Sequence, residues 1–154
     1  VQYFHYDDCT FVHREQTMAE EPSPGTEAPG AQTRPRACVL LVDDDEMIRK
    51  HTGRLLEAMQ YDVITAAGGD EALTIYRAQH DRIDYVVLDY ALGNWNGLDV
   101  FDRMKTVNPA IRAYLGTGYA HADAIKDAQE RGMCGILSKP YTVRQIRSAF
   151  HQTS

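Results

Sequence analysis

The feature that most constrains the fold is a strict alternation, from residue 37 onward, of short apolar runs with longer amphipathic stretches. A short apolar run bounded by polar residues is typical of a strand buried on both faces, and apolar residues every three or four positions are typical of a helix. The predicted strands are 38–42, 62–66, 85–88, 111–116 and 135–138. The predicted helices are 46–59, 69–80, 97–107, 121–131 and 142–151.

This alternation predicts an α/β fold in which a parallel sheet is covered by helices on both faces. Because crossover connections are right-handed, we expect a three-layer, flavodoxin-like, doubly wound (βα)5 sheet with strand order 2-1-3-4-5. Asp45 is placed to cap the first helix. In the last helix, Val143, Ile146 and Phe150 share one face and are expected to point inward.

Residues 1–36 differ from the rest. The stretch 19–36 is rich in Pro, Gly, Ala and Glu and offers little to bury, so we expect a flexible linker there, preceded by the stump of another domain or an incidental tail. His5, Cys9 and His13 are spaced by four and are metal-ligand types, although a coincidental run is the favoured interpretation. Residues 37–154 are expected to form the functional domain.

Composition narrows the function. A net charge of −6 argues against a nucleic-acid binder that works by bulk electrostatics, and no apolar run is long enough for a membrane span. The three cysteines are odd in number and form no CxxC pair, which fits a reducing compartment. We therefore expect a cytoplasmic domain that contacts neither nucleic acid nor membrane.

Polar residues follow four of the five predicted strands. Asp43 and Asp44 follow the first strand, Asp89 the third, Thr117 the fourth and Lys139 the fifth. Clustered carboxylates repel one another unless a cation compensates, and Mg²⁺ suits a few carboxylates together with a phosphate. With an ammonium and a hydroxyl opposite, the site suits a tetrahedral oxyanion bound to a carboxylate. Asp89, at the middle of the sheet edge, is the natural nucleophile.

Four segments carry a family resemblance: VDDDEMIR, VVLDYALGNWNGLDV, LGTGYA and GILSKPYT. They resemble the signature blocks of response-regulator receiver domains, the CheY-like superfamily, and cover residues 37–152. The resemblance implies that Asp89 accepts a phosphoryl group and that Asp44 binds Mg²⁺ directly. It also implies that Asp43 acts through a water and that the backbone carbonyl of Ala91 is the third protein ligand of the ion.

The resemblance implies roles at the other strand ends as well. Thr117 matches the switch hydroxyl and Lys139 the lysine that pairs with the phosphoryl group. Pro140 matches a proline that typically follows a cis peptide bond, and Gly97 the glycine at which the third helix begins. Trp95, the only tryptophan, is expected in the loop beside the site, where its fluorescence should respond to Mg²⁺.

Two positions depart from the family pattern. Gly93 stands where the family usually has proline, which predicts a more mobile loop without loss of chemistry. Ile136 stands where the family usually has the aromatic residue that rotates on activation. Tyr119, two residues after Thr117, is the candidate substitute; its alternative role is that of a rim aromatic packed on the fourth helix.

The resemblance implies a phosphoacceptor of two-component signalling rather than a conventional enzyme. Its partner would be a phospho-His donor, either a histidine kinase or a phosphotransfer protein. Phosphorylation would switch the face formed by the fourth strand, fourth helix and fifth strand, for partner control or phosphorelay. Because the tether precedes the receiver, we expect the C-terminal receiver of a hybrid sensor histidine kinase; a stand-alone receiver, or one trimmed from a larger regulator, is the alternative. Any kinase activity would reside in another domain.

Three other functions compete as interpretations of the same residues. An FMN-binding flavodoxin needs a phosphate loop after the first strand, and DDDE there would repel a phosphate. A haloacid-dehalogenase-type phosphatase wants a second Asp at position 91, which is Ala. A pseudo-receiver that binds partners without phosphorylation stays open as the alternative.

Overall fold

A six-stranded sheet forms the centre of the protein. The computed structural model describes residues 2–3, 36–118 and 122–151. In spatial order the strands are β1 (Gln2–Tyr3), β8 (Gly135–Ser138), β7 (Ala113–Thr117), β4 (Tyr85–Asp89), β2 (Cys38–Val42) and β3 (Asp62–Ala66). The five strands from β8 to β3 are parallel, which confirms the predicted order. The sequence did not predict β1, which pairs antiparallel with β8 at the sheet edge.

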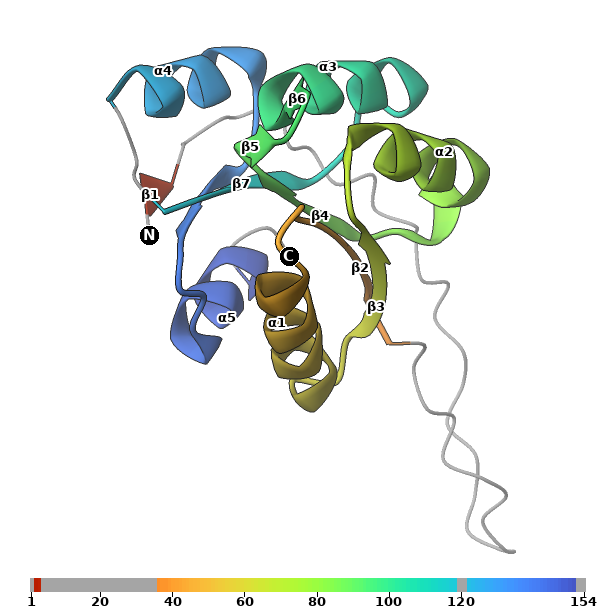
Figure 1. Cartoon of the computed structure of the whole chain (residues 1–154), viewed down its shortest axis with the longest axis vertical. Helices are drawn as coiled ribbons and strands as arrows, with labels where there is room; N and C mark the ends of the chain where they lie inside the picture. Colours follow the sequence, from red (N-terminus) through yellow and green to blue (C-terminus); the bar gives the residue numbers. More distant parts are fainter. Residues whose placement is uncertain (1, 4–35, 119–121, 152–154) are drawn as a thin grey trace, which may run out of the picture.

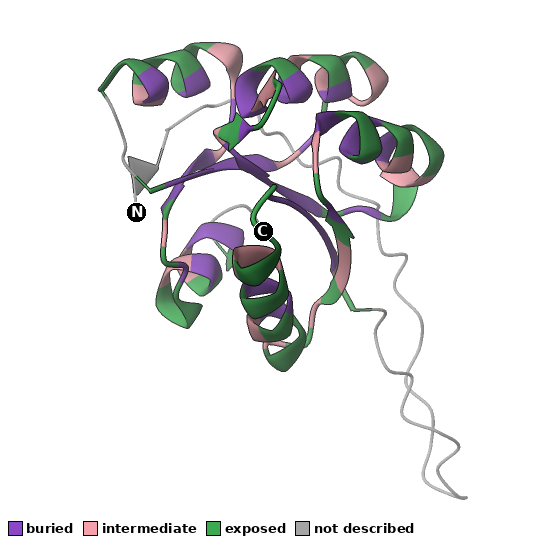
Figure 2. Ribbon diagram, viewed as in Figure 1, coloured by how far each residue is buried: buried purple, intermediate pink, exposed green. Residues whose placement is uncertain are grey.

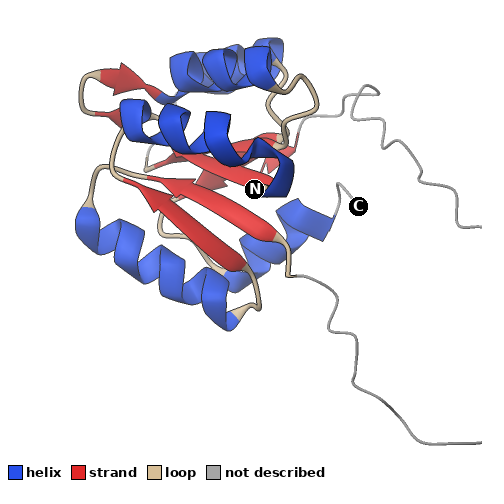
Figure 3. Ribbon diagram, turned by 90° about the vertical axis from the view of Figure 1, so that its right-hand side faces the viewer, coloured by secondary structure: helices blue, strands red, loops and turns tan. Residues whose placement is uncertain are grey.

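Helices cover both faces of the sheet, so the predicted three layers are confirmed (Figures 1 and 3). One face carries α2 (Gly69–Gln79), α3 (Gly97–Val107) and α4 (Ala122–Arg131), and the other carries α1 (Glu46–Ala58) and α5 (Val143–His151). Three short elements were not predicted: the 3-10 helix η1 (His80–Arg82) and a hairpin of β5 (Ala91–Leu92) and β6 (Trp95–Asn96).

The core lies in two apolar clusters, one on each face of the sheet. Figure 2 shows β2, β4 and β7 buried along their whole length, the edge strand β3 partly exposed, and the outer helix faces exposed. On the α1–α5 face, the Tyr85 and Phe150 rings stack with centroids 4.1 Å apart. The larger cluster, on the α2–α4 face, includes Leu40, Tyr76, Leu98, Phe101, Met104 and Leu115. Burial of this apolar surface is the main force that holds the helices to the sheet.

Some local expectations hold and others fail. Asp45 caps α1, because its side chain accepts from the backbone N–H groups of Met47 and Ile48. In α5, Ile146 and Phe150 are buried as predicted, but Val143 is 39% exposed, so its predicted inward position is wrong. Val143 is the first residue of α5, where the helix has only begun to approach the sheet.

Two expectations concern segments that the structure describes only in part. The predicted linker and the run at His5, Cys9 and His13 lie outside the described residues. Among the helices that the structure does describe, none has the length and apolar character that crossing a membrane requires.

Candidate functional site

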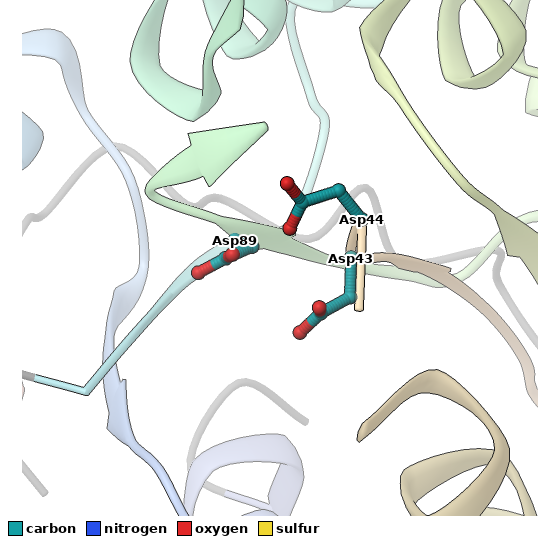
Figure 4. Close-up of side chains that lie close together, drawn as sticks. All are labelled: Asp43, Asp44 and Asp89. Atoms are coloured by element: carbon teal, nitrogen blue, oxygen red, sulfur yellow. The ribbon is translucent and has the colours of Figure 1, made fainter. Parts of the chain in front are cut away.

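Three carboxylates converge at the carboxyl ends of the two central strands. Asp43 and Asp44 follow β2 and Asp89 ends β4 (Figure 4). One oxygen of each carboxylate lies within 4.8 Å of the others. Asp43 is fully buried, Asp89 is 8% exposed and Asp44 is exposed. The structure thus brings together the three acids that the sequence placed at neighbouring strand ends.

Local hydrogen bonds hold the loop that carries these acids. The Asp45 backbone N–H donates to Asp43 Oδ1 at 2.9 Å, and Arg49 Nη1 donates to the Asp43 carbonyl at 2.6 Å. Arg49 projects back from the first turn of α1, so the helix fixes the loop from which Asp43 points inward. Sequence reasoning missed Arg49, although it ends the VDDDEMIR segment.

Lys139 reaches the acids from the far side of the site. Its Nζ lies 2.6 Å from Asp43 Oδ2 and 3.0 Å from Asp89 Oδ1. The Lys139 backbone N–H donates to the Thr117 carbonyl at 2.9 Å, and the Lys139–Pro140 peptide bond is cis, as the resemblance implied. The ammonium therefore bridges the two buried carboxylates.

Burial and charge act together on the pKa values of this site. Burial lowers the pKa of Lys139, but close contact with Asp43 and Asp89 outweighs it, so the pKa is raised and the ammonium persists. Burial raises the pKa of Asp89, the contact with Lys139 lowers it, and the charges of Asp43 and Asp44 raise it; the net pKa is raised. One ammonium thus offsets only part of the negative charge of three acids.

This donor set fits a hard divalent cation. Oxygen ligands from a few carboxylates, with room for water and phosphate, are what Mg²⁺ prefers. Asp44 is exposed and faces the same space as Asp43 and Asp89, so an ion could reach all three (Figure 4). Ala91 lies in β5, two residues beyond Asp89, and its carbonyl as a further ligand stays a prediction.

The remaining predicted site residues occupy the β7–β8 side. Thr117 ends β7, is 5% exposed and lies opposite Ser138 of β8. Ile136 of β8 is 2% exposed and belongs to the apolar cluster on the face that α2, α3 and α4 cover. Its hydrocarbon side chain cannot make a hydrogen bond in the site. Tyr119 lies outside the described residues, so its suggested switch role stays a prediction.

A family model described as the response regulator receiver domain matches residues 39–151. The chain belongs to the response regulator receiver family. A similar curated relative is sporulation initiation phosphotransferase F of Bacillus subtilis, 32% identical over 72% of this chain and 88% of that protein. Sensor kinase CckA of Brucella abortus is 30% identical over 71% of this chain but only 12% of its own length. The receiver therefore also resembles one part of a much longer protein.

Solved receiver structures agree with this assignment. A response regulator receiver domain protein from Clostridium thermocellum superposes with a TM-score of 0.72, at 27% identity over 76% of this chain and 93% of that chain. A response regulator from Burkholderia pseudomallei, solved with a phosphorylated aspartic acid, calcium ion and citrate, has a TM-score of 0.68. It is 31% identical and covers 74% of this chain and 66% of its own. The receiver is accordingly a domain of two-component signalling.

The β5–β6 hairpin, which the sequence did not predict, lines one side of the receiver site. Trp95 Nε1 donates to Asp70 Oδ2 at 3.0 Å, and the Arg103 guanidinium lies 4.4 Å from the Trp95 ring. The ring lies against Gly69, where a Cβ atom would come within 2.6 Å of it. Trp95 and Asp44 line one cavity of about 400 Å³, so the tryptophan does lie beside the site.

Proposed function

We propose that Asp89 is the phosphoacceptor of this receiver and that it takes its phosphoryl group from a phospho-His donor. The observation that carries the proposal is the bridge of Lys139 Nζ between Asp43 and Asp89, with Asp44 on the open side. An acceptor carboxylate needs positive charge beside it to offset the charge that gathers on the phosphoryl oxygens. Lys139 provides that charge from one side, and the acid cluster can hold a cation on the other.

The transfer step is a substitution at phosphorus. A carboxylate oxygen of Asp89 attacks, the P–N bond of the donor imidazole breaks, and the imidazole nitrogen keeps the electron pair and is protonated by solvent. The product is an acyl phosphate on Asp89. Lys139 Nζ, already 3.0 Å from Asp89 Oδ1, needs only a small movement to meet a phosphoryl oxygen. Thr117, buried at the end of β7, can add a hydroxyl donor.

Receiver domains bind Mg²⁺, and Asp43, Asp44 and Asp89 would hold it here, joined by the Ala91 carbonyl. When bound, the ion neutralises charge on the acids and on the phosphoryl oxygens. The acids themselves are already positioned: Asp43 is fixed by Asp45 N–H and by the contact with Lys139.

The proposed output is a change on the face formed by β7, α4 and β8. Thr117 ends β7, and α4 is the next helix along the chain, so movement of the Thr117 hydroxyl toward a phosphoryl group would act on this face. The face would then bind or release a partner protein or pass the phosphoryl group on through a relay.

For context, we propose that this receiver serves in the cytoplasm as part of a hybrid sensor histidine kinase. The likeness to sensor kinase CckA of Brucella abortus supports this placement, and the likeness to the Bacillus subtilis phosphotransferase supports a stand-alone receiver instead. An antibody raised against residues 37–151 would decide between them. A hybrid kinase would give a band several times larger than this 154-residue chain.

The test of the proposed function is intact mass after incubation with acetyl phosphate and Mg²⁺. The native chain should gain one phosphoryl group, and both EDTA and the Asp89→Asn variant should abolish the gain. If the small-molecule donor fails, a phosphorylated histidine kinase or phosphotransfer protein is the second donor to try. A folded protein that accepts a phosphoryl group from none of these donors would be a pseudo-receiver.

A further inference from the structure

A buried tyrosine hydroxyl lies beside the acid cluster without a hydrogen-bond partner. Tyr141 follows Pro140 and is 8% exposed. Within the described part of the chain, its Oη is one of two buried side-chain oxygens that make no hydrogen bond; the other is Asp43 Oδ2. A buried hydroxyl without a partner destabilises the fold, so phenylalanine would suit this position better unless the hydroxyl has a role in another state of the protein.

The backbone makes room for this hydroxyl. A Cβ atom at Gly116 would lie 1.9 Å from Tyr141 Oη, so the hydroxyl occupies the space that a side chain on β7 would fill. Gly116 is the register partner of Asp89, and Asp43 follows Val42, whose partner is Leu88. Asp43, Asp89 and Gly116 therefore form one row across β2, β4 and β7, and the hydroxyl lies at the end of that row.

The side chains of this row point to the face of the sheet that α1 and α5 cover. Leu41, Val87 and Tyr114 each lie two residues before a member of the row, and all three belong to the apolar cluster on that face. Side chains two apart in a strand point the same way. Tyr141 belongs to the same cluster, so its hydroxyl and the Asp43 carboxylate approach the site from the same side.

The other oxygen, Asp43 Oδ2, is the one that Lys139 contacts. Asp43 Oδ2 and Lys139 Nζ form an ion pair and lie 2.6 Å apart. Lys139 shares its single ammonium between Asp43 and Asp89. A phosphoryl group on Asp89 would compete for that ammonium and leave Asp43 Oδ2, in a fully buried residue, short of a partner.

We propose that Tyr141 is a positioning residue whose hydroxyl donates a hydrogen bond to Asp43 when Lys139 turns to a phosphoryl group on Asp89. This inference rests on the proposed function. The hydroxyl is a donor at all working pH values, because burial, together with the charges of Asp43 and Asp89, raises the pKa of Tyr141 well above its ordinary value. The donor is unsatisfied in the unphosphorylated state and satisfied in the phosphorylated one, so it favours the second.

The test is the Tyr141→Phe variant with beryllofluoride and Mg²⁺, which together mimic the phosphoryl group. The ring is kept and only the hydroxyl is lost. We expect the free variant to unfold at the same temperature as the native protein or higher, since an unsatisfied hydroxyl has been removed. Its affinity for beryllofluoride, measured from the rise of the unfolding midpoint with ligand concentration, should fall about tenfold, the worth of one hydrogen bond to a charged group.

Tyr114→Phe is the matched control. Its hydroxyl donates to the Ala149 carbonyl at 2.8 Å, away from the acids, so its loss should lower the stability of the free and bound protein alike and leave the affinity unchanged. Native affinity in Tyr141→Phe, or an equal loss in Tyr114→Phe, would overturn the inference while the proposed function stands. If the native protein does not bind beryllofluoride, this inference fails, and the intact-mass test alone then decides whether the proposed function fails as well.

Discussion

Helices α3 and α4 lie side by side on one face of the sheet but are held to it by different forces (Figure 1). α3 buries four large apolar side chains: Leu98, Val100, Phe101 and Met104. α4 fully buries only Ala124 and Ala128, with Ile125 half-buried beside them. Because hydrophobic stabilisation scales with the apolar area removed from water, α3 is anchored far more strongly than α4.

Polar contacts make up part of the difference at α4. Arg131, its last residue, forms ion pairs with Asp99 and Asp102 of α3, and Lys105 Nζ donates to the Arg131 carbonyl at 2.8 Å. Exposed ion pairs of this kind contribute little stability and can be remade in another geometry. We therefore expect α4 to be displaced from the sheet more easily than α3.

The largest expected effect on the free energy of unfolding comes from removing a buried apolar side chain of α3. Phe101 is fully buried against the sheet, so Phe101→Ala should lower the free energy of unfolding by about 3–5 kcal/mol. The matched change in α4 is Ile125→Ala, which should cost about 1 kcal/mol because the side chain is only half-buried. Urea unfolding of both variants gives the comparison. Equal losses would mean that α4 is anchored as firmly as α3.

The start of α3 should also tolerate less change than the approach to α4. A Cβ atom at Gly97 would lie 2.2 Å from the Asp89 backbone oxygen, whereas a Cβ at Gly118 meets nothing within 4 Å. Gly97→Ala should therefore cost about 1–3 kcal/mol, the usual cost of overpacking, and displace the end of β4. Gly118→Ala should leave stability within about 0.5 kcal/mol. Thermal unfolding of the pair measures this, and a stable Gly97→Ala protein would contradict it.

Asp89, whose backbone oxygen lies close to the first residue of α3, should lower the free energy of unfolding when it is ionised and no metal is bound. Burial raises its pKa above the ordinary Asp value, so the folded state favours the protonated form. The stability that this contributes is present at low pH and is lost as the pH rises through the raised value. In EDTA at neutral pH, Asp89→Asn should therefore be more stable than the native protein. The difference should vanish below the ordinary Asp pKa, and its persistence there would assign it to packing.

The sequence predicted the sheet order and the meeting of Asp43, Asp44, Asp89 and Lys139 at one sheet edge, because both depend on patterns that can be read along the chain. Buried parallel strands are apolar throughout, and residues that end neighbouring strands must meet at one edge. Asp43, Asp44, Asp89 and Lys139 were therefore found from position alone. The cap at Asp45 is equally local.

What failed depends on contacts that no periodicity encodes. The strand β1 and the β5–β6 hairpin are each only two residues long per strand, too short to leave an alternation. The partnerless hydroxyl of Tyr141 arises because Gly116, on a distant strand, leaves a space for it. Val143 fits the apolar stripe of its helix but lies where α5 has just begun, so periodicity alone placed it wrongly.

The smallest effect on global stability should come from the ion pairs that join α4 to α3. Their removal is the most direct test of the difference between the two helices. Arg131→Met removes the ion pairs with Asp99 and Asp102 but keeps much of the apolar stem. The free energy of unfolding should fall by less than about 1 kcal/mol, because the pairs are partly exposed. Amide exchange should nevertheless quicken throughout α4 and stay unchanged in α3, since a weakly anchored helix opens locally before the domain unfolds.

The Lys50→Met variant separates this local effect from the loss of a salt bridge in general. Lys50 pairs with Glu46 at 2.6 Å within α1 and joins no second helix, so its loss should leave exchange in α4 untouched. If Arg131→Met also leaves α4 protected, the two small alanines hold that helix by themselves. The expected difference in local stability between α3 and α4 would then be absent.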